Sequence, residues 1–155
     1  MIRYAIKLPL ALLFTTLIGC TSGLTPKKTI RINIKASEQL NPYSGVEQHP
    51  LFIQVVQLKN IDHFQSLDFK SLYNEPAKAL GEDLIYLEQT FPIKPGDTVT
   101  KTIKPEPDTD FIGLLYFFSN FEKATTRHWL PVQPRKKQCF NILLNNTKGL
   151  IERCK

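Results

Sequence analysis

The sequence of 155 residues has little of the chemistry from which active sites are built. It contains no glycine-rich phosphate loop, no H-E-x-x-H metal motif and no G-x-S-x-G nucleophile turn. Its three histidines, His49, His63 and His128, are far apart and show no i, i+4 spacing, whereas a metal site needs three or four convergent ligands. The sequence therefore favours a protein that is not an enzyme and uses no metal or cofactor.

A dense charge of one sign is also missing. Lys and Arg number 20 against 14 Asp and Glu, and both signs are spread along the chain. The one dense basic run, Arg135-Lys136-Lys137, is typical of a solvated turn, with contact to anionic lipid headgroups as the alternative. This balance argues against a nucleic-acid partner.

The sequence has no apolar run long enough to span a bilayer, which requires about 20 predominantly apolar residues. The N-terminal apolar stretch, residues 8–18, is shorter and is interrupted by Pro9 and two threonines. Arg3 and Lys7 precede it, and small or polar residues follow it at positions 19–23. This pattern is typical of a cleaved secretory signal.

The residues Leu17-Ile18-Gly19-Cys20 resemble the lipobox of bacterial lipoproteins, in which the cysteine is acylated and becomes the first mature residue. The resemblance implies a signal peptide over residues 1–19, a lipid anchor on Cys20, and a flexible tether up to residue 28. Thr21 stands where lipoproteins retained in the inner membrane usually carry aspartate. It therefore favours the periplasmic face of the outer membrane. A plain signal peptide is the alternative.

The 136 residues that follow position 19 suit one domain with a single core. Ile30, Ile32 and Ile34 alternate with polar residues, which predicts a strand with one buried face. A second strand is predicted over 51–58, and short helical turns at 60–64, 67–73 and 76–80, with Asn60 and Asp68 as caps. Strand-sized runs then alternate with turn signals, as in a β-sandwich, at 84–91, 99–103, 111–118, 127–132, 139–144 and 150–154.

Two cysteines, Cys139 and Cys154, remain once Cys20 carries lipid. They flank the turn residues 145–148 almost symmetrically, so a hairpin about that turn would place them opposite each other. Because an exported compartment is oxidising, the sequence predicts a disulfide between them. Two reduced core cysteines are the alternative.

Several local motifs occur in an order and spacing that resemble those of the TssJ family, the outer-membrane lipoproteins of bacterial type VI secretion. The similarity covers the whole mature chain. The motifs are Leu40-Asn41-Pro42 before a loop, a strand ending in Gln57-Leu58-Lys59, an aromatic helical insertion with Phe64, Phe69 and Tyr73, Ala79-Leu80-Gly81-Glu82-Asp83-Leu84, the turn Lys94-Pro95-Gly96-Asp97, and Phe111-Ile112-Gly113 followed by an aromatic run and Trp129.

The resemblance implies an all-β fold, a transthyretin-like two-sheet β-sandwich of about eight strands with short helical insertions, over residues 29–155. It also implies binding to the periplasmic C-terminal domain of TssM, an inner-membrane protein that forms the trans-envelope complex together with TssL. TssL would then be an indirect partner. Outer-membrane lipid would be contacted through the acylated Cys20.

We expect the loop at residues 40–49, between the first two strands, to present Tyr43, Val46 and Glu47 to the partner. The Pro, Gly and Asn content of this connection argues against regular structure over most of its length. Tyr43 is the expected anchor, because aromatic side chains dominate interface hot spots. A solvated, mobile loop is the alternative. The expected contact residues are Leu40, Asn41, Pro42, Tyr43, Ser44, Gly45, Val46 and Glu47.

Two other classes of function stay open. One is a periplasmic carrier or inhibitor that holds a small ligand or peptide in or on the sandwich. The other is an envelope hydrolase whose catalytic residues are too dispersed to be visible in the sequence.

Overall fold

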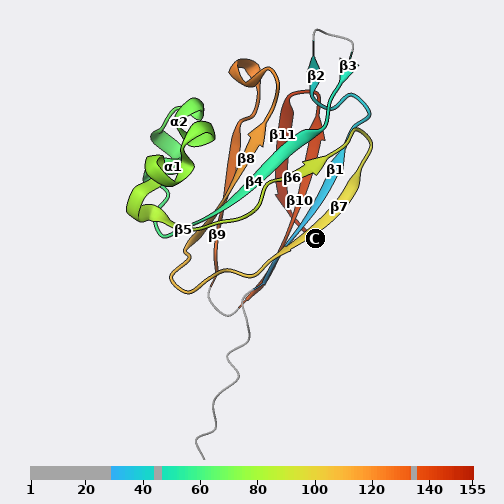
Figure 1. Ribbon diagram of the computed structural model, residues 1–155. Coiled ribbons are helices and arrows are strands. Elements are labelled where there is room, and N and C mark those ends of the chain that lie inside the picture. The colour runs from blue at the N-terminus through green and yellow to red at the C-terminus, as the bar shows by residue number, and fades with distance from the viewer. Residues whose placement is uncertain (1–28, 44–46, 134–135) are drawn as a thin grey trace, which may run out of the picture.

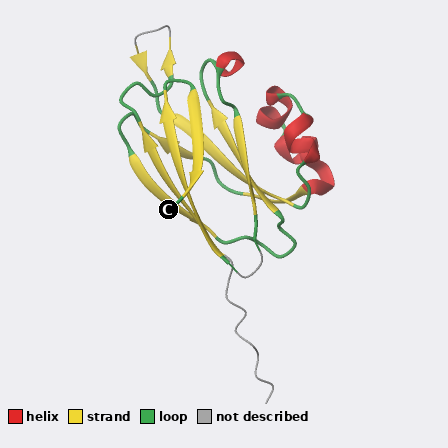
Figure 2. Ribbon diagram, turned by 180° about the vertical axis from the view of Figure 1, so that it is seen from behind, coloured by secondary structure: helices red, strands yellow, loops and turns green. Residues whose placement is uncertain are grey.

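The computed structural model describes residues 29–43, 47–133 and 136–155. The predicted signal peptide, Cys20, the tether and residues 44–46 lie outside the described residues. The described chain forms two β-sheets packed face to face, with short helices on the outer face of one sheet (Figures 1 and 2). None of the helices in these ranges has the length and apolar character needed to cross a membrane.

The first sheet has the strand order β11-β10-β1-β7. β1 and β10 are parallel, with Thr29 beside Lys137, and the other pairs are antiparallel. The predicted alternation in the first strand is confirmed, since Ile30, Ile32 and Ile34 are at most 2% exposed. The strands are β1 (Thr29–Ala36), β7 (Thr98–Ile103), β10 (Lys137–Asn145) and β11 (Lys148–Arg153).

The second sheet has the order β5-β4-β8-β9, and β6 also pairs with β4. The strand predicted over 84–91 is wrong in extent, because the chain forms two short strands with Glu88 between them. The Glu88 carboxylate there accepts a hydrogen bond from Gln57 and lies 3.5 Å from Lys101 Nζ. The strands are β4 (Leu51–Leu58), β5 (Leu84–Leu87), β6 (Phe91–Ile93), β8 (Phe111–Phe117) and β9 (Arg127–Pro131).

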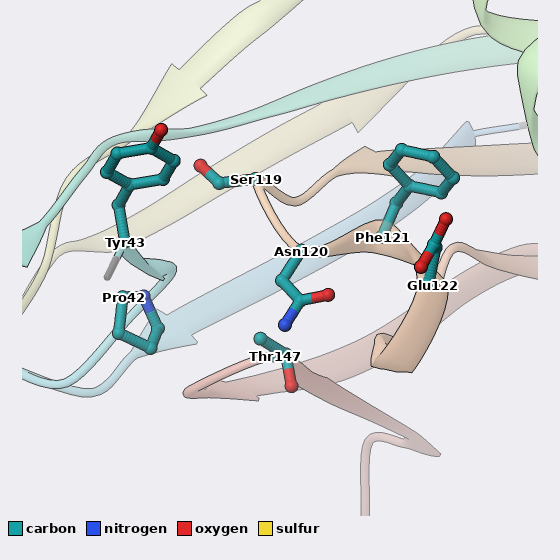
Figure 3. A pocket seen from close by; sticks show the side chains of 7 residues that line it. All are labelled: Pro42, Tyr43, Ser119, Asn120, Phe121, Glu122 and Thr147. Carbon is teal, nitrogen blue, oxygen red and sulfur yellow. The ribbon is translucent and has the colours of Figure 1, made fainter. Parts of the chain in front are cut away.

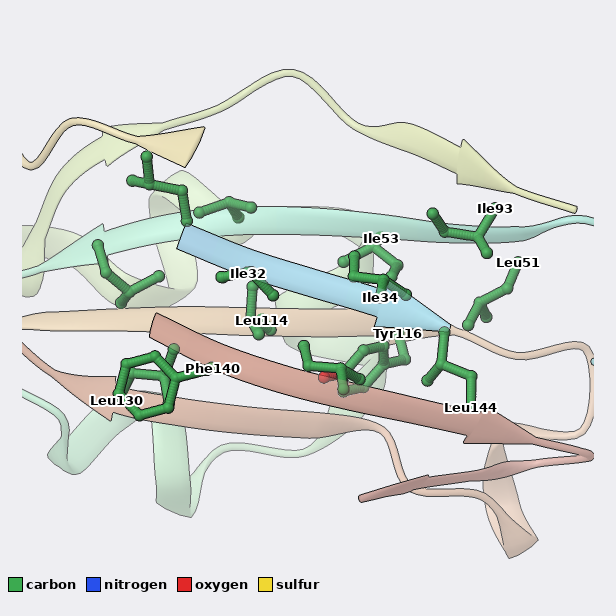
Figure 4. Packing of buried hydrophobic residues seen from close by; sticks show 14 of the residues in the cluster. Ile32, Ile34, Leu51, Ile53, Ile93, Leu114, Tyr116, Leu130, Phe140 and Leu144 are labelled. Atoms are coloured by element: carbon green, nitrogen blue, oxygen red, sulfur yellow. The ribbon is translucent and has the colours of Figure 1, made fainter. Parts of the chain in front are cut away.

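The main core lies between the inner faces of the two sheets (Figure 4). Ile32 and Ile34 of β1 belong to the same buried cluster as Ile53 of β4, Leu114 of β8 and Phe140 of β10. Side chains from both sheets thus fill the interior at close packing, as a stable β-sandwich requires.

Helices α1 (Asp62–Ser66), α2 (Phe69–Asn74) and α3 (Pro76–Leu80), followed by η1 (Gly81–Asp83), cover part of the outer face of the second sheet. The predicted cap at Asp68 is confirmed, because its Oδ1 accepts the Ser71 backbone N–H at 3.0 Å. Hydrogen bonds from the Ser71 hydroxyl and backbone lower the Asp68 pKa. A second core cluster forms beneath the helices from Val56, Leu58, Phe64, Leu72, Leu80 and Leu115.

The sandwich presents different features at its two ends (Figure 1). β1 begins at the end where Cys139 and Cys154 lie next to each other. It runs toward the opposite end, which carries the paired strands β2 (Pro42–Tyr43) and β3 (Glu47–Gln48) and the short helix η2 (Phe121–Lys123).

Candidate partner-binding site

The segment predicted as an irregular loop is a hairpin at its two ends. Pro42 pairs with Gln48 and Tyr43 with Glu47, in antiparallel register. The expectation of irregular structure over most of this segment holds for the described residues 37–41, 49 and 50. These four residues are the exception, because each short strand pairs with the other. The hairpin stands at the tip of the sandwich (Figure 1). The candidate contact residues Ser44, Gly45 and Val46 lie between the two strands, outside the described residues.

Asn41 fixes the base of this hairpin. Its side-chain Nδ2 donates to the Pro50 carbonyl at 3.1 Å, and its Oδ1 accepts the Ser119 backbone N–H at 2.8 Å. Its backbone N–H donates to the Asn146 carbonyl at 2.8 Å, and its carbonyl accepts the His49 N–H at 3.2 Å. The φ of +49° is one that asparagine tolerates better than most residues.

Two of the predicted contact residues are buried in the folded domain. Leu40 is fully buried in the main core, and Asn41 is 2% exposed. In this arrangement they support the hairpin from below, whereas Pro42, Tyr43 and Glu47 remain accessible along its described length. The described residues of the predicted set therefore fall into two groups: Leu40 and Asn41 are buried, and the hairpin strand residues are accessible.

Among the large hydrophobic residues that the structure describes, Tyr43 is the most exposed, with 58% of its surface accessible. One edge of its ring packs against His49, with 5.7 Å between the ring centroids in a T-shaped arrangement. The His49 ring lies in turn 3.8 Å from the Glu47 carboxylate. These contacts reduce the rotational freedom of Tyr43 before any partner arrives, which lowers the entropic cost of binding through it.

An open hollow lies beside Tyr43 (Figure 3). It has a volume of about 500 Å³ and is formed by three separate segments: the hairpin, the chain around η2, and the β10–β11 turn. The sequence did not indicate that the last two segments belong to the site, since nothing in their local pattern reveals that they meet the hairpin. The hollow is lined by Pro42, Tyr43, Ser119, Asn120, Phe121, Glu122 and Thr147.

The histidines do not cluster with one another in the described part of the chain. No group of three or more His, Cys, Asp or Glu in these ranges could hold a metal ion. His63 contacts Asp83 at 2.7 Å beside α1, His49 lies at the hairpin, and His128 contacts the Tyr116 hydroxyl at 3.0 Å. The three histidines therefore occupy three separate environments.

Cys139 and Cys154 are joined by a disulfide, with 5.3 Å between their Cα atoms. The antiparallel register of β10 and β11 sets Phe140 opposite Arg153, and this brings the adjoining Cys139 and Cys154 next to each other. The disulfide lies at the end of the sandwich away from the hairpin. A cysteine held in this bond is not available as a nucleophile.

The contact between the half-buried His128 and the buried Tyr116 predicts a pH dependence of stability. Burial lowers the pKa of His128, because the charged imidazolium loses solvent, and burial raises the pKa of Tyr116. In the unfolded chain this histidine has a pKa of about 6.5, so it binds a proton at pH values at which His128 of the folded chain is still neutral. We therefore expect the stabilisation by neutral His128 to be fully present above a pH of about 6.5, and the free energy of unfolding to fall as the pH drops below this value.

The measurement is the melting temperature (Tm) between pH 7.5 and pH 5.5 for the wild type and for His128→Gln. The wild type should lose more of its Tm over this interval than the variant does. His63→Gln is the control, because His63 is largely exposed. Its Tm should fall over this interval by as much as that of the wild type. Equal slopes for wild type and His128→Gln would contradict the prediction.

The family model described as "Type VI secretion lipoprotein, VasD, EvfM, TssJ, VC_A0113" matches residues 28–147 of the chain. The match thus spans nearly the whole described sandwich, from the start of β1 to the β10–β11 turn. No curated protein gives a significant match.

Solved structures of similar chains come from the same secretion system. The T6SS lipoprotein TssJ1 from Pseudomonas aeruginosa is 23% identical, with 84% of this chain and 98% of that chain covered and a TM-score of 0.78. Serratia marcescens Lip, described as a membrane-bound component of the type VI secretion system, is 23% identical, with 84% and 99% covered and a TM-score of 0.72.

A further similar chain occurs in a structure described as the T6SS protein TssM C-terminal domain from EAEC. It is 20% identical, with 83% of this chain and 98% of that chain covered and a TM-score of 0.64. At such identities the likeness shows the fold, and it confirms the predicted two-sheet β-sandwich.

Proposed function

The chain belongs to the type VI secretion lipoprotein family, as its sequence motifs indicated, and from this membership we propose that it binds the periplasmic C-terminal domain of TssM. By doing so it fixes the trans-envelope complex to the outer membrane. The observation that carries the proposal is the exposed, partly immobilised Tyr43 on a hairpin whose base is hydrogen-bonded into the sandwich. TssL takes part indirectly, through TssM.

In this proposal the N-terminal segment supplies the anchor. Residues 1–19 are removed, Cys20 carries the acyl chains, and residues 21–28 form the tether. An extended chain covers at most about 3.5 Å per residue, so Cys20 lies within about 30 Å of Thr29. Several acyl chains give stable anchoring, whereas one chain holds only marginally.

The position of Thr29 then sets the direction in which the partner is met. The tether joins the domain at the end opposite the hairpin. With that end kept near the outer membrane, the hairpin projects away from it into the periplasm. This is the side from which an inner-membrane protein approaches, which supports the hairpin as the contact.

The solved structures add support for TssM as the partner. One similar chain is found in a structure described as the T6SS protein TssM C-terminal domain, which is consistent with TssM as the partner. The function requires no chemistry beyond binding, in keeping with the separated histidines and the disulfide-bonded cysteines.

We expect Tyr43→Ala to weaken TssM binding by about 30-fold, which corresponds to about 2 kcal/mol for loss of an interface anchor. The measurement is titration calorimetry of residues 21–155 with the periplasmic C-terminal domain of TssM from the same organism. Because Tyr43 is exposed, the Tm of the variant should equal that of the wild type.

Tyr86→Ala is the matched control, because Tyr86 is 49% exposed on β5, away from the hairpin. It should bind as the wild type does. A well-folded wild-type domain that fails to bind TssM would overturn the proposal and favour a periplasmic carrier of a small ligand or peptide.

A further inference from the structure

We propose that the TssM domain makes a second contact with this protein, on an aromatic shelf next to the hairpin. The shelf consists of Phe69 and Tyr73 of α2, Phe117 of β8 and Phe121 of η2. The inference rests on the proposed function and deepens it, since it assigns a further part of the binding surface to the same partner.

The four rings of the shelf contact one another. Phe69 stacks on Phe121 with 5.0 Å between ring centroids, and Tyr73 meets Phe117 edge-on at 4.9 Å. Phe69 bridges the two pairs, at 5.9 Å from Tyr73 and 6.2 Å from Phe117. The shelf is therefore one connected aromatic surface built from three segments that are distant in the sequence.

The shelf lies where the helical layer ends. The helices fully bury Val56 and Leu115 on the outer face of the second sheet. Toward the hairpin end of the same strands, Phe52 pairs with Phe117 and is 46% exposed, and Tyr73 is 52% exposed. Adjoining exposed aromatic side chains on a small domain are typical of an interaction surface.

The shelf is continuous with the hairpin surface. Ser119 and Phe121 line the hollow beside Tyr43, and they also line a second open hollow of about 300 Å³ above the shelf. The chain around η2 is thus the wall common to both hollows. A partner that contacts Tyr43 and extends across Phe121 therefore reaches the other three rings of the shelf.

The size of a stable interface requires such an extension. Specific interfaces use about 20–30 residues on each side. The hairpin from Pro42 to Gln48 has only a few residues, so that it cannot supply this surface alone. The shelf is the adjoining surface with exposed aromatic rings, which are enriched among residues that dominate binding energy.

The charge at the shelf indicates the chemistry of the partner segment. Among the described residues that line the shelf hollow, Lys70 is the one charged side chain. Its Nζ lies 5.7 Å from the centroid of the Phe121 ring. The segment of the TssM domain that occupies the shelf should therefore present apolar side chains together with a carboxylate that faces Lys70.

The test is calorimetric titration of residues 21–155 with the TssM domain, using Tyr73→Ala and Lys70→Glu. Lys70 is exposed, so Lys70→Glu should keep the wild-type Tm. Tyr73→Ala gives up ring contacts with Phe69 and Phe117, so its Tm is measured beside its affinity, and the titration is run at a temperature at which the variant is folded. We expect Tyr73→Ala to weaken binding by about tenfold or more, as a hot-spot truncation does. Lys70→Glu should weaken binding by at least about fivefold, and this loss should shrink at high salt.

Tyr86→Ala and Lys104→Glu are the matched controls for truncation and charge reversal. Lys104 is exposed just after β7, at the end of the sandwich away from the hairpin, and each control should bind within twofold of the wild type. If Tyr43→Ala weakens binding while Tyr73→Ala and Lys70→Glu both stay within twofold, the shelf proposal is overturned and the proposed function stands. If the folded wild type does not bind TssM, the proposed function and the shelf contact both fail.

Discussion

The double variant Cys139→Ser/Cys154→Ser should unfold on the order of 10 °C below the wild type. The disulfide joins residues 15 positions apart, and closing a loop of this length contributes about 3 kcal/mol in the chain-entropy model. The effect should concentrate on β11, because it is an edge strand that pairs only with β10 among the described strands. Without the disulfide, the C-terminal strand depends on its ladder hydrogen bonds and on the packing of Ile151 against the core.

The reductant dithiothreitol separates the covalent bond from other effects of the serine side chains. It should lower the Tm of the wild type by a similar amount and leave the double variant unchanged. Binding to TssM should survive in the variant below its Tm, because the disulfide lies at the end of the sandwich away from the hairpin. A double variant that melts within 2 °C of the oxidised wild type would contradict the predicted contribution.

The strands could be predicted from the sequence where one local pattern decides the structure. The isoleucine alternation at residues 30–34 becomes β1, and the apolar run at 111–118 becomes β8, an interior strand between β4 and β9. The cap at Asp68 and the turn at Gly96, with its φ of +78°, also follow from local chemistry. In each case the residues close by in the sequence are sufficient to predict the local structure.

The arrangement of the strands depends on contacts between distant residues, which the local pattern does not contain. The parallel pairing of β1 with β10 joins residues more than 100 positions apart. Gln57, which interrupts an apolar strand in the sequence, is 2% exposed. Its Oε1 accepts hydrogen bonds from the Glu106 N–H at 2.7 Å and the Thr109 hydroxyl at 3.0 Å. Gln57 thus holds the connection between β7 and β8 against β4.

The candidate site was predictable only in part for the same reason. The resemblance to the TssJ family directs attention to residues 40–47, and Tyr43 is exposed there as an anchor would be. The neighbouring Phe121 comes from a turn more than 70 positions later, and it joins the hairpin surface only through the fold. The buried role of Asn41 likewise depends on its hydrogen bond to Ser119.

Asn41→Ala should destabilise the domain by about 3 kcal/mol and should also weaken binding to TssM. The loss of the side chain removes hydrogen bonds to the Pro50 carbonyl and the Ser119 N–H, each worth about 1 kcal/mol. Alanine at a φ of +49° adds about 1 kcal/mol of backbone strain. Binding should suffer because the hairpin base no longer holds Tyr43 in place. The measurements are denaturant unfolding and calorimetric titration with the TssM domain.

Asn41→Gly separates the side-chain contribution from the backbone strain, since glycine adopts a positive φ without a steric penalty. It should be less destabilising than Asn41→Ala by about 1 kcal/mol, while it weakens TssM binding by at least as much. The two roles open to Asn41 differ in their pattern of results. A residue that positions the hairpin lowers both the free energy of unfolding and the affinity, whereas a residue that contacts the partner directly lowers the affinity alone. An Asn41→Ala variant with wild-type stability and weakened binding would therefore return Asn41 to the contact surface and contradict its place at the base of the hairpin.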